Sequence, residues 1–396
     1  MKKKYKTMGI QDLYKVIPKS QLITYHLSEF ENMRLAVDIS IFLYKSIRSC
    51  GPERWMSNFI MLLCVLKKNK IRAVCIFDGP NFPPEKAVEQ RRRREQNAKD
   101  LDKLAQAIKM RNYLQDSIAD IDELDEETIK KCKSIIRTSR EQDFTVYSNV
   151  SDIIESLKVV IQKKEFKTIP ITNEHKESAK IIVEMMGLHM VQADGEAEAL
   201  CTSLAIMGEV DAVLTEDTDV LAYLNPKSKP GQHSGIPLML AFKNYKISDE
   251  TVIGIHLSSL LEELELNHYE FRDLCILLSC DYNNRVKGYP PDEKKRKKPV
   301  SIGVVHALAM IEEYRTLENV SNHLEDESPL IYERCRELFT PPNVDKTMMR
   351  PYNLSPDYTR LETFINEHRI TISLEYIKNC YKNESIEFDD EIIESD

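Results

Sequence analysis

Strand-like runs of apolar residues recur along the chain, and segments with helical spacing lie between two pairs of them. The five runs are 33–40 (MRLAVDIS), 72–79 (RAVCIFDG), 187–193 (GLHMVQA), 211–217 (DAVLTED) and 236–242 (IPLMLAF). Helical patterns cover residues 54–69 and 196–207. Such alternation is typical of an α/β fold, so we predict a mainly parallel, twisted sheet flanked by helices.

One long segment interrupts this alternation. From Pro83 to about Glu184 the sequence shows no clear buried strand, and polar helical periodicity predicts an insertion of extended helices. After residue 256 the pattern becomes helical again and predicts a mostly α C-terminal half. The expected regions are 8–85 and 185–330 for the two parts of the core, 86–184 for the helical insertion, 331–383 for a C-terminal region and 384–396 for a disordered acidic tail.

The net charge of −9 over 396 residues conceals a strong asymmetry. The last fourteen residues hold seven acids and no base, so the rest of the chain carries only −2. Local net charges of +5 over residues 86–112 and +4 over residues 287–298 are typical of a phosphate-binding surface. A solvated helix face is the alternative interpretation of any single charged run.

Several classes of protein are disfavoured. The longest strongly apolar run, residues 59–66, is less than half of the ~20 residues that a membrane span needs. The basic N-terminus lacks the apolar segment of a secretory signal, which predicts an intracellular protein. The nine cysteines include no C-x-x-C pair, so we expect them to be reduced and mostly buried and not to bind zinc.

Acidic residues follow the predicted strands. Asp38 and Asp78 end two apolar runs, and Asp217 and Asp219 come just after a third. Ligands of open α/β sheets bind outside the carboxyl ends of the strands, so these acids are expected to converge there. Unpaired carboxylates in one crevice repel one another and require a counter-charge. The simplest counter-charge is a hard divalent cation.

Three more acids fit the same site. Glu196 and Glu198 lie ~200° apart on a regular helix, so both can face one site only if Glu196 stands at the helix start. Asp194 and Gly195 supply an N-cap and a turn there. Asp281 follows the apolar helical pattern FRDLCILLSC.

These segments resemble the motifs of the flap endonucleases, within the XPG-type family of structure-specific 5′ nucleases. The similar segments, in the order of the family, are MGIQDLYK, LAVDIS, CIFDG, GEAEALC, TEDTDVLAY and DLCILLSCDYN. The resemblance implies a PIN-like nuclease core that binds two Mg²⁺ or Mn²⁺ ions. The positions that match the seven metal-site acids of the family are Asp38, Asp78, Glu196, Glu198, Asp217, Asp219 and Asp281.

The resemblance also implies residues that contact DNA. In this family a helical arch carries a Lys and an Arg to the scissile phosphate, and Lys86 and Arg93 are the best matches. Arg92 is the alternative to Arg93, because four consecutive arginines leave the register open. Tyr44 resembles an aromatic residue that stacks on a base, although a core position is equally compatible with it. Further expected DNA contacts are Arg91, Arg94, Lys287, Lys294, Lys295, Arg296, Lys297 and Lys298.

Three features depart from the family pattern. Seven residues, MKKKYKT, precede the methionine at which such proteins usually begin. The family's G-x-G-P-K-R-A hairpin, part of a helix–two-turn–helix, is degenerate here, since Ser301, Val304, Val305 and His306 replace its glycine, proline and basic pair. No sliding-clamp peptide stands near the C-terminus. A divergent member, of the kind that a large DNA virus could encode, is therefore expected.

The sequence predicts a Mg²⁺-dependent, structure-specific DNA endonuclease and 5′–3′ exonuclease of replication, repair or recombination. The expected partner is branched or nicked DNA, the expected state is a monomer, and the expected location is the nucleus or a viral replication site. A non-catalytic DNA-binding relative and a metal-dependent ribonuclease of the same core remain alternatives. A phosphatase with a D-x-D-x-[TV] nucleophile is disfavoured, because Leu221 occupies the last position and Glu196 and Glu198 would have no role.

Overall fold

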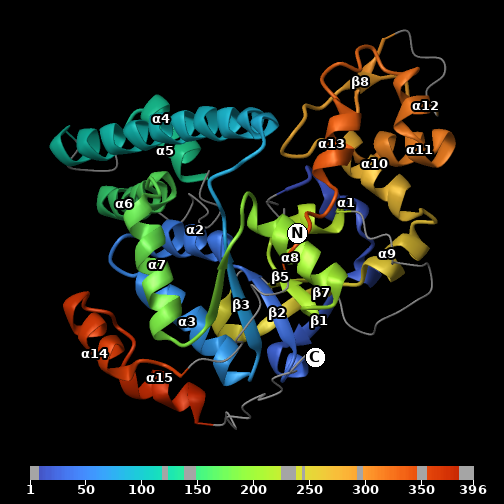
Figure 1. Ribbon diagram of the computed structural model, residues 1–396. Coiled ribbons are helices and arrows are strands. Elements are labelled where there is room, and N and C mark those ends of the chain that lie inside the picture. The colour runs from blue at the N-terminus through green and yellow to red at the C-terminus, as the bar shows by residue number, and fades with distance from the viewer. Residues whose placement is uncertain are drawn as a thin grey trace, which may run out of the picture.

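The computed structural model describes residues 9–117, 124–137, 149–223, 238–242, 246–291, 298–345 and 355–382. A central sheet carries helices on both faces, and a helical arm extends to one side (Figure 1). The predicted acidic tail, the N-terminal MKKKYKT segment and the basic residues 294–297 lie outside the described residues. In the part of the chain that is described, no helix is long and apolar enough to cross a membrane.

The sheet has seven strands in the order β1-β7-β6-β5-β2-β3-β4. The five neighbouring strands from β6 to β4 run parallel, and β7 and β1 extend the sheet with antiparallel pairing. The strands are β1 (Ile23–His26), β2 (Arg34–Asp38), β3 (Arg72–Phe77), β4 (His189–Gln192), β5 (Ala212–Leu214), β6 (Met239–Phe242) and β7 (Thr251–Ile255). The predicted mainly parallel sheet, with its five strands, is confirmed.

The apolar pattern does not predict β1 and β7, which form one side of the sheet. Three of the four β1 residues are exposed to solvent, so no apolar run marks this edge strand. In β7 the sequence TVIGI is short, includes a glycine and alternates between partly and fully buried positions at its start. Partly exposed strands of this kind lack the continuous apolar signal of the buried parallel strands.

Alternate residues of the central strands face two different hydrophobic cores. Ala36 of β2 and Val74 of β3 face one core, whereas Leu35, Val37 and Cys75 face the other. Because both faces are covered, every position from 35 to 38 and from 73 to 77 is buried, which explains the continuous apolar runs. Eight of the nine cysteines are buried, as their apolar surroundings predict.

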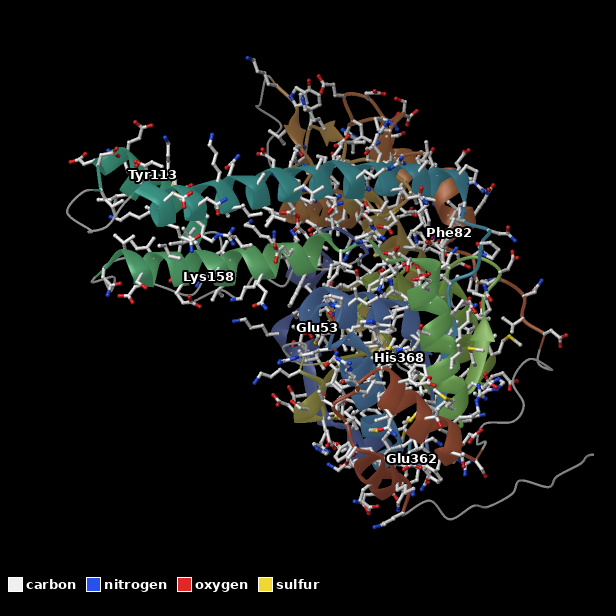
Figure 2. The ribbon with its side chains drawn as sticks, turned by 90° about the vertical axis from the view of Figure 1, so that its left-hand side faces the viewer. Glu53, Phe82, Tyr113, Lys158, Glu362 and His368 are labelled. Carbon is white, nitrogen blue, oxygen red and sulfur yellow. The ribbon has the colours of Figure 1, made fainter. Side chains whose placement is uncertain are left out.

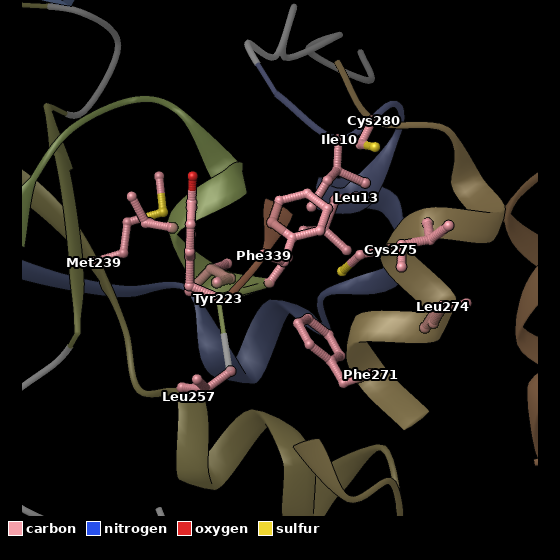
Figure 3. Packing of buried hydrophobic residues seen from close by; sticks show 14 of the residues in the cluster. Ile10, Leu13, Tyr223, Met239, Leu257, Phe271, Leu274, Cys275, Cys280 and Phe339 are labelled. Carbon is pink, nitrogen blue, oxygen red and sulfur yellow. The ribbon is translucent and has the colours of Figure 1, made fainter. Parts of the chain in front are cut away.

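Helices cover both faces of the sheet. The core of Ala36, part of which Figure 3 shows, is completed by α1 (Leu13–Val16), α8 (Ala197–Met207), α9 (Leu257–Glu263), α10 (His268–Leu278), α11 (Val304–Tyr314), α12 (Leu317–Ser321) and α13 (Tyr332–Leu338). The core of Leu35 is completed by α2 (Ile39–Cys50), α3 (Trp55–Lys68), α7 (Asn173–Met185), α14 (Tyr358–Glu367) and α15 (Leu374–Tyr381).

Short 3-10 helices and a small hairpin complete the described elements. The hairpin pairs β8 (Lys287–Gly288) with β9 (Val300–Ser301) and lies between α10 and α11. The 3-10 helices are η1 (Lys19–Gln21), η2 (Leu27–Phe30), η3 (Pro84–Lys86), η6 (Thr218–Leu221) and η8 (Ile247–Asp249). The C-terminal half is thus mostly helical, as predicted.

The predicted helical insertion forms the arm. It consists of α4 (Ala87–Ser117), α5 (Glu126–Arg137) and α6 (Val150–Thr168). Helix α4 has 31 residues, hence a length of about 46 Å, and it lies along α6 with Tyr113 at its outer end and Lys158 on α6 (Figure 2). The arm has a hydrophobic core of its own, made of Leu114, Leu124, Cys132, Ile136, Val150, Ile153 and Leu157.

The separate core of the arm leads to a prediction about stability. Ile153 is fully buried there, and truncating such a residue costs about 2–5 kcal/mol locally. We expect Ile153→Ala to speed limited proteolysis within residues 87–168 while the main melting transition changes little, because this core shares no residue with the other two. Leu63→Ala, in the core of Leu35, is the matched control and should lower the main transition. An equal loss of melting temperature in both variants would contradict a separately stabilised arm.

Candidate active site

Three adjacent parallel strands carry acidic residues to the same edge of the sheet. Asp38 is the last residue of β2, Asp78 directly follows β3, and Asp217 lies three residues beyond β5. Since β2 pairs with both β3 and β5, these carboxylates converge where parallel strands end. The Thr215 hydroxyl donates a hydrogen bond of 2.9 Å to Asp38 and fixes its orientation.

Glu196 and Glu198 join the cluster from the start of α8. Glu196 is the N-cap and has extended backbone (φ −83°, ψ 135°), so the regular helical rotation does not separate it from Glu198. Asp194 does not cap the helix, contrary to the prediction, because it lies in the bend before Glu196. The carboxylate of Asp78 accepts a hydrogen bond of 3.0 Å from the first helical amide in its place.

Asp219 and Asp281 complete the group. Asp219 lies in η6, where its amide donates a 3.0 Å hydrogen bond to the Asp217 side chain that caps this short helix. Asp281 lies in the loop after α10, and its Oδ2 atom is 3.7 Å from Lys86 Nζ and 3.4 Å from Arg93 Nη2. The structure therefore brings all seven predicted acids together with two basic side chains from the arm and its base.

The carboxylates destabilise one another's charged forms. Six of the seven are buried, and Asp78 is partly buried. Burial, followed by the nearby charges of Glu198 and Asp281, raises the pKa of Asp217 to about 8. Burial and neighbouring carboxylates also raise the pKa values of Asp38, Glu198 and Asp219. Such an arrangement persists in folded proteins where it serves a function.

Lys86 supplies a counter-charge inside the cluster. Its ammonium group forms an ion pair with Glu196 Oε1 and lies 3.6 Å from a carboxylate oxygen of Glu198. Burial alone would lower the pKa of Lys86, but Glu198 and Asp281 outweigh it and raise that pKa. Lys86 is therefore charged, yet one lysine and one arginine do not balance seven carboxylates.

The residues fit a site for hard divalent cations. Both carboxylate oxygens of Asp219 are fully buried and accept no hydrogen bond from any described residue, which leaves their lone pairs available for a cation. Among the described residues, no three His, Cys, Asp or Glu side chains converge closely enough to hold an ion by themselves. Mg²⁺ does not require this, since it keeps several waters and binds through one or two carboxylates plus substrate phosphates.

Two neighbouring arginines at the start of α4 make different contacts. Arg93 donates a hydrogen bond of 3.4 Å to Asp281 and another of 2.7 Å to Glu89, so its guanidinium faces the cluster. Arg92 instead donates to the backbone carbonyls of Cys280 and Asn283, at 3.0 and 3.3 Å, and holds the loop that carries Asp281. The geometry therefore favours Arg93 over Arg92 for contact with a substrate phosphate.

The remaining predicted DNA contacts are distributed over the surface. Arg91 and Arg94 are exposed on α4, where Arg94 donates to the Gln90 carbonyl oxygen at 3.3 Å. Lys287 is exposed in β8, and Lys298 is exposed two residues before β9. The positions that depart from the family's G-x-G-P-K-R-A pattern lie just before α11 or in its first turn. Among them, Val305 is 74% exposed.

Tyr44 lies beside the cluster and outside both main cores. Burial and the charge of Asp78 raise the pKa of its hydroxyl, while the charges of Arg93, Arg48 and Lys86 oppose this shift. Arg48, one helical turn further along α2, is exposed and forms no ion pair or hydrogen bond with a described residue. Arg48 is not among the predicted DNA contacts, although its spacing of four residues from Tyr44 indicates the same helix face.

Two further residues shape the site without an obvious sequence signal. Gly9 has φ of +78°, and a Cβ atom there would lie 2.0 Å from an oxygen of Asp217 and 2.5 Å from one of Asp219, so only glycine fits. Tyr282 is buried, and its hydroxyl donates a hydrogen bond to Glu196 Oε2. Both residues sit within the recognised motifs, but only the fold shows which acids they touch.

Family models cover both halves of this site. The XPG N-terminal domain matches residues 8–100, and the XPG I-region matches residues 187–281. Together these segments contain all seven acids, Lys86 and Arg93.

Individual proteins show the same relationship. A probable RAD2-like endonuclease of Invertebrate iridescent virus 3 is 27% identical over 91% of this chain and 94% of its own length. Flap endonuclease 1 of Zea mays is 32% identical over 65% of this chain and 64% of its own length. The catalytic core of Rad2 in complex with DNA substrate has the same fold, with a TM-score of 0.60 and 18% identity over 94% of this chain and 98% of that core. The chain therefore contains an XPG N-terminal domain and an XPG I-region, and the named endonucleases among its relatives identify it as a phosphodiester hydrolase.

Proposed function

We propose that the protein is a divalent-metal-dependent, structure-specific DNA endonuclease and 5′–3′ exonuclease. The observation that carries this proposal is the cluster of seven carboxylates at one sheet edge, faced by Lys86 and Arg93. Structural ion pairing does not account for it, because the acids outnumber the nearby cations and, within the described part of the chain, neither carboxylate oxygen of Asp219 has a hydrogen-bond partner.

The seven acids would hold two Mg²⁺ or Mn²⁺ ions. When bound, two such ions supply an activated water and stabilise the leaving oxygen of an in-line phosphodiester hydrolysis. The protein's own contribution is orientation. Thr215 and the backbone amides at the starts of α8 and η6 hold three of the carboxylates. Lys86 and Arg93 place positive charge beside the acids, where a scissile phosphate would add negative charge.

DNA with a junction is the substrate that the surroundings of the site favour. The basic face of α4 and the hairpin lysines Lys287 and Lys298 provide positive charge away from the acids, as backbone binding requires. Tyr44 offers an aromatic ring at the mouth of the site for base stacking. We propose branched or nicked DNA as the partner and a monomeric, intracellular enzyme that acts in the nucleus or at a viral replication site, in replication, repair or recombination.

A non-catalytic relative and a ribonuclease of the same core are the competing functions. The retention of all seven acids, with Asp219 left unsatisfied, argues against a protein that only binds DNA. The long arm and the helical C-terminal half favour structured DNA over a small single-stranded RNA. End-labelled flap, gap, nick and bubble DNAs, with RNA strands of the same sequence, would separate these functions by which strands are cut.

The repulsion in the cluster gives the first prediction for this site. Asp217→Asn retains the acceptor that caps η6 but removes one of the mutually repelling charges, so we expect an unchanged or higher melting temperature without metal. We also expect cleavage to fall by at least about a hundredfold and the stabilisation by Mg²⁺ to diminish. Melting with and without Mg²⁺ and single-turnover cleavage are the measurements.

Asp211→Asn is the matched control for that variant. Asp211 precedes the opposite end of β5 and pairs with Arg34 at 3.1 Å, away from the cluster. Its variant should keep both the Mg²⁺ response and the cleavage rate. Cleavage by Asp217→Asn at nearly the wild-type rate in Mg²⁺ would refute the assignment of the acids to metal binding.

The arginines of α4 give the next prediction. We expect Arg93→Ala to lower the single-turnover rate by about 10²–10³ while DNA affinity falls much less, since its guanidinium faces the reacting edge. Arg94→Ala is the control on the same helix and should act mainly on affinity and its salt dependence. Arg92→Ala should lower the melting temperature, because it frees the loop of Asp281.

Saturating enzyme separates chemical from binding effects in this series. If Arg92→Ala abolished the chemical step without loss of stability while Arg93→Ala did not, the register of the arm would be wrong by one residue. If no arginine variant changed the chemical step, the arm would have no role in catalysis.

A further inference from the structure

A group of buried aromatic residues lies behind the carboxylate cluster. The Phe339 ring contacts the rings of Tyr223 and Tyr282 edge-on, with centroid separations of 5.4 Å in both pairs. None of the three side chains is more than 1% exposed. Figure 3 shows Tyr223 and Phe339 facing each other in this core. Their two tyrosine hydroxyls are therefore out of reach of solvent and need partners inside the protein.

The partner of the Tyr282 hydroxyl is a predicted metal acid. The Tyr282 hydroxyl donates a hydrogen bond to Glu196 Oε2, and the hydroxyls of Tyr282 and Tyr223 also share a hydrogen bond. Because the single O–H of Tyr282 is used in the bond to the carboxylate, Tyr223 is the donor to Tyr282. Two buried hydroxyls thus form a short chain that ends on Glu196.

Glu196 needs such a partner more than the neighbouring acids do. Asp38, Asp78 and Asp217 each accept a hydrogen bond from a backbone amide close to them in the fold. Glu196 is an N-cap whose side chain accepts none from its own helix, and it has one more rotatable bond than an aspartate. Tyr282 restrains Oε2 of this longer side chain, while Oε1 forms the ion pair with Lys86.

We propose that Tyr282 is a positioning residue that holds Glu196 for metal binding, with Tyr223 and Phe339 keeping Tyr282 in place. This inference rests on the proposed metal-dependent function. Because Tyr282 fixes Oε2, Oε1 is the oxygen that can release Lys86 and bind a cation in its place. The carboxylate is then already oriented before the ion binds. Outer partners of metal ligands are typically worth 10–100-fold in metal affinity or activity.

Tyr282→Phe tests the proposal because it removes only the hydroxyl. In the full chain without DNA, we expect Mn²⁺ affinity, measured by calorimetric titration, to fall by about tenfold. The Mg²⁺ concentration that gives half-maximal single-turnover cleavage should rise by a similar factor, while the rate at saturating Mg²⁺ recovers most of the wild-type value. DNA affinity without divalent metal should stay within about twofold of wild type.

Tyr381→Phe is the matched control for loss of a buried tyrosine hydroxyl. Tyr381 donates to the Met186 carbonyl in the other main core, so its variant should lose stability but keep its affinity for Mn²⁺. If Tyr282→Phe does not fold, Tyr223→Phe serves in its place. This variant removes the support of Tyr282 without touching Glu196, and it should shift Mn²⁺ affinity in the same direction by a smaller factor.

The outcomes distinguish this inference from the proposed function. Unchanged Mn²⁺ affinity and Mg²⁺ dependence in Tyr282→Phe, with a wild type that binds Mn²⁺ and cleaves DNA, would overturn the positioning role alone. Unchanged affinity in Tyr223→Phe would do the same if that variant is the one tested. A wild type that neither binds Mn²⁺ nor cleaves any of the DNA structures would overturn the proposed function itself.

Discussion

Electrostatic repulsion among buried carboxylates is the constraint on which the site depends. Two like charges 4 Å apart repel by about 4 kcal/mol at an effective dielectric constant of 20, and this cluster gathers seven acids. Burial is the largest cause of the raised pKa values of Asp38, Asp217 and Asp219, and this repulsion adds to it. The fold must therefore supply enough favourable packing elsewhere to hold charges that disfavour the folded state. The two continuous cores on the faces of the sheet provide that packing.

The arm and the C-terminal helices share the task of neutralising the cluster. Lys86 enters it from the base of the arm, where the preceding residue, Glu85, accepts a 2.8 Å hydrogen bond from Arg334 of α13. On the same helix, Arg336 pairs with Asp273 of α10. The position of the one buried counter-charge thus depends on contacts made by the C-terminal half. This explains how elements far apart in the sequence jointly determine the electrostatics of a single sheet edge.

The sequence predicts a structural feature correctly where the tertiary fold imposes a pattern on neighbouring residues. Strands buried on both faces must be apolar throughout, so the positions of Asp38 and Asp78 at their ends were predictable. The edge strand β1 carries no such requirement, and the apolar pattern does not predict it. The choice between Arg92 and Arg93 was open because adjacent helical residues differ by about 100° in direction, and only the packing of α4 against the loop of Asp281 fixes that direction. The link between Tyr282 and Glu196 joins residues 86 positions apart and has no local signature.

Glu196 shows how the separate constraints meet in one side chain. Its backbone ends the turn before α8, one carboxylate oxygen contacts a lysine from the base of the arm, and the other accepts a hydrogen bond from the Tyr282 hydroxyl. A DNA phosphate brought to this edge would attract Lys86 and Arg93, and the acids would then lose part of their internal neutralisation. Cations from solvent would have to replace it. On electrostatic grounds alone, DNA binding and divalent-metal binding therefore strengthen each other at this edge. Glu196 is already held at Oε2, so it can exchange Lys86 for a cation with the least rearrangement of its side chain.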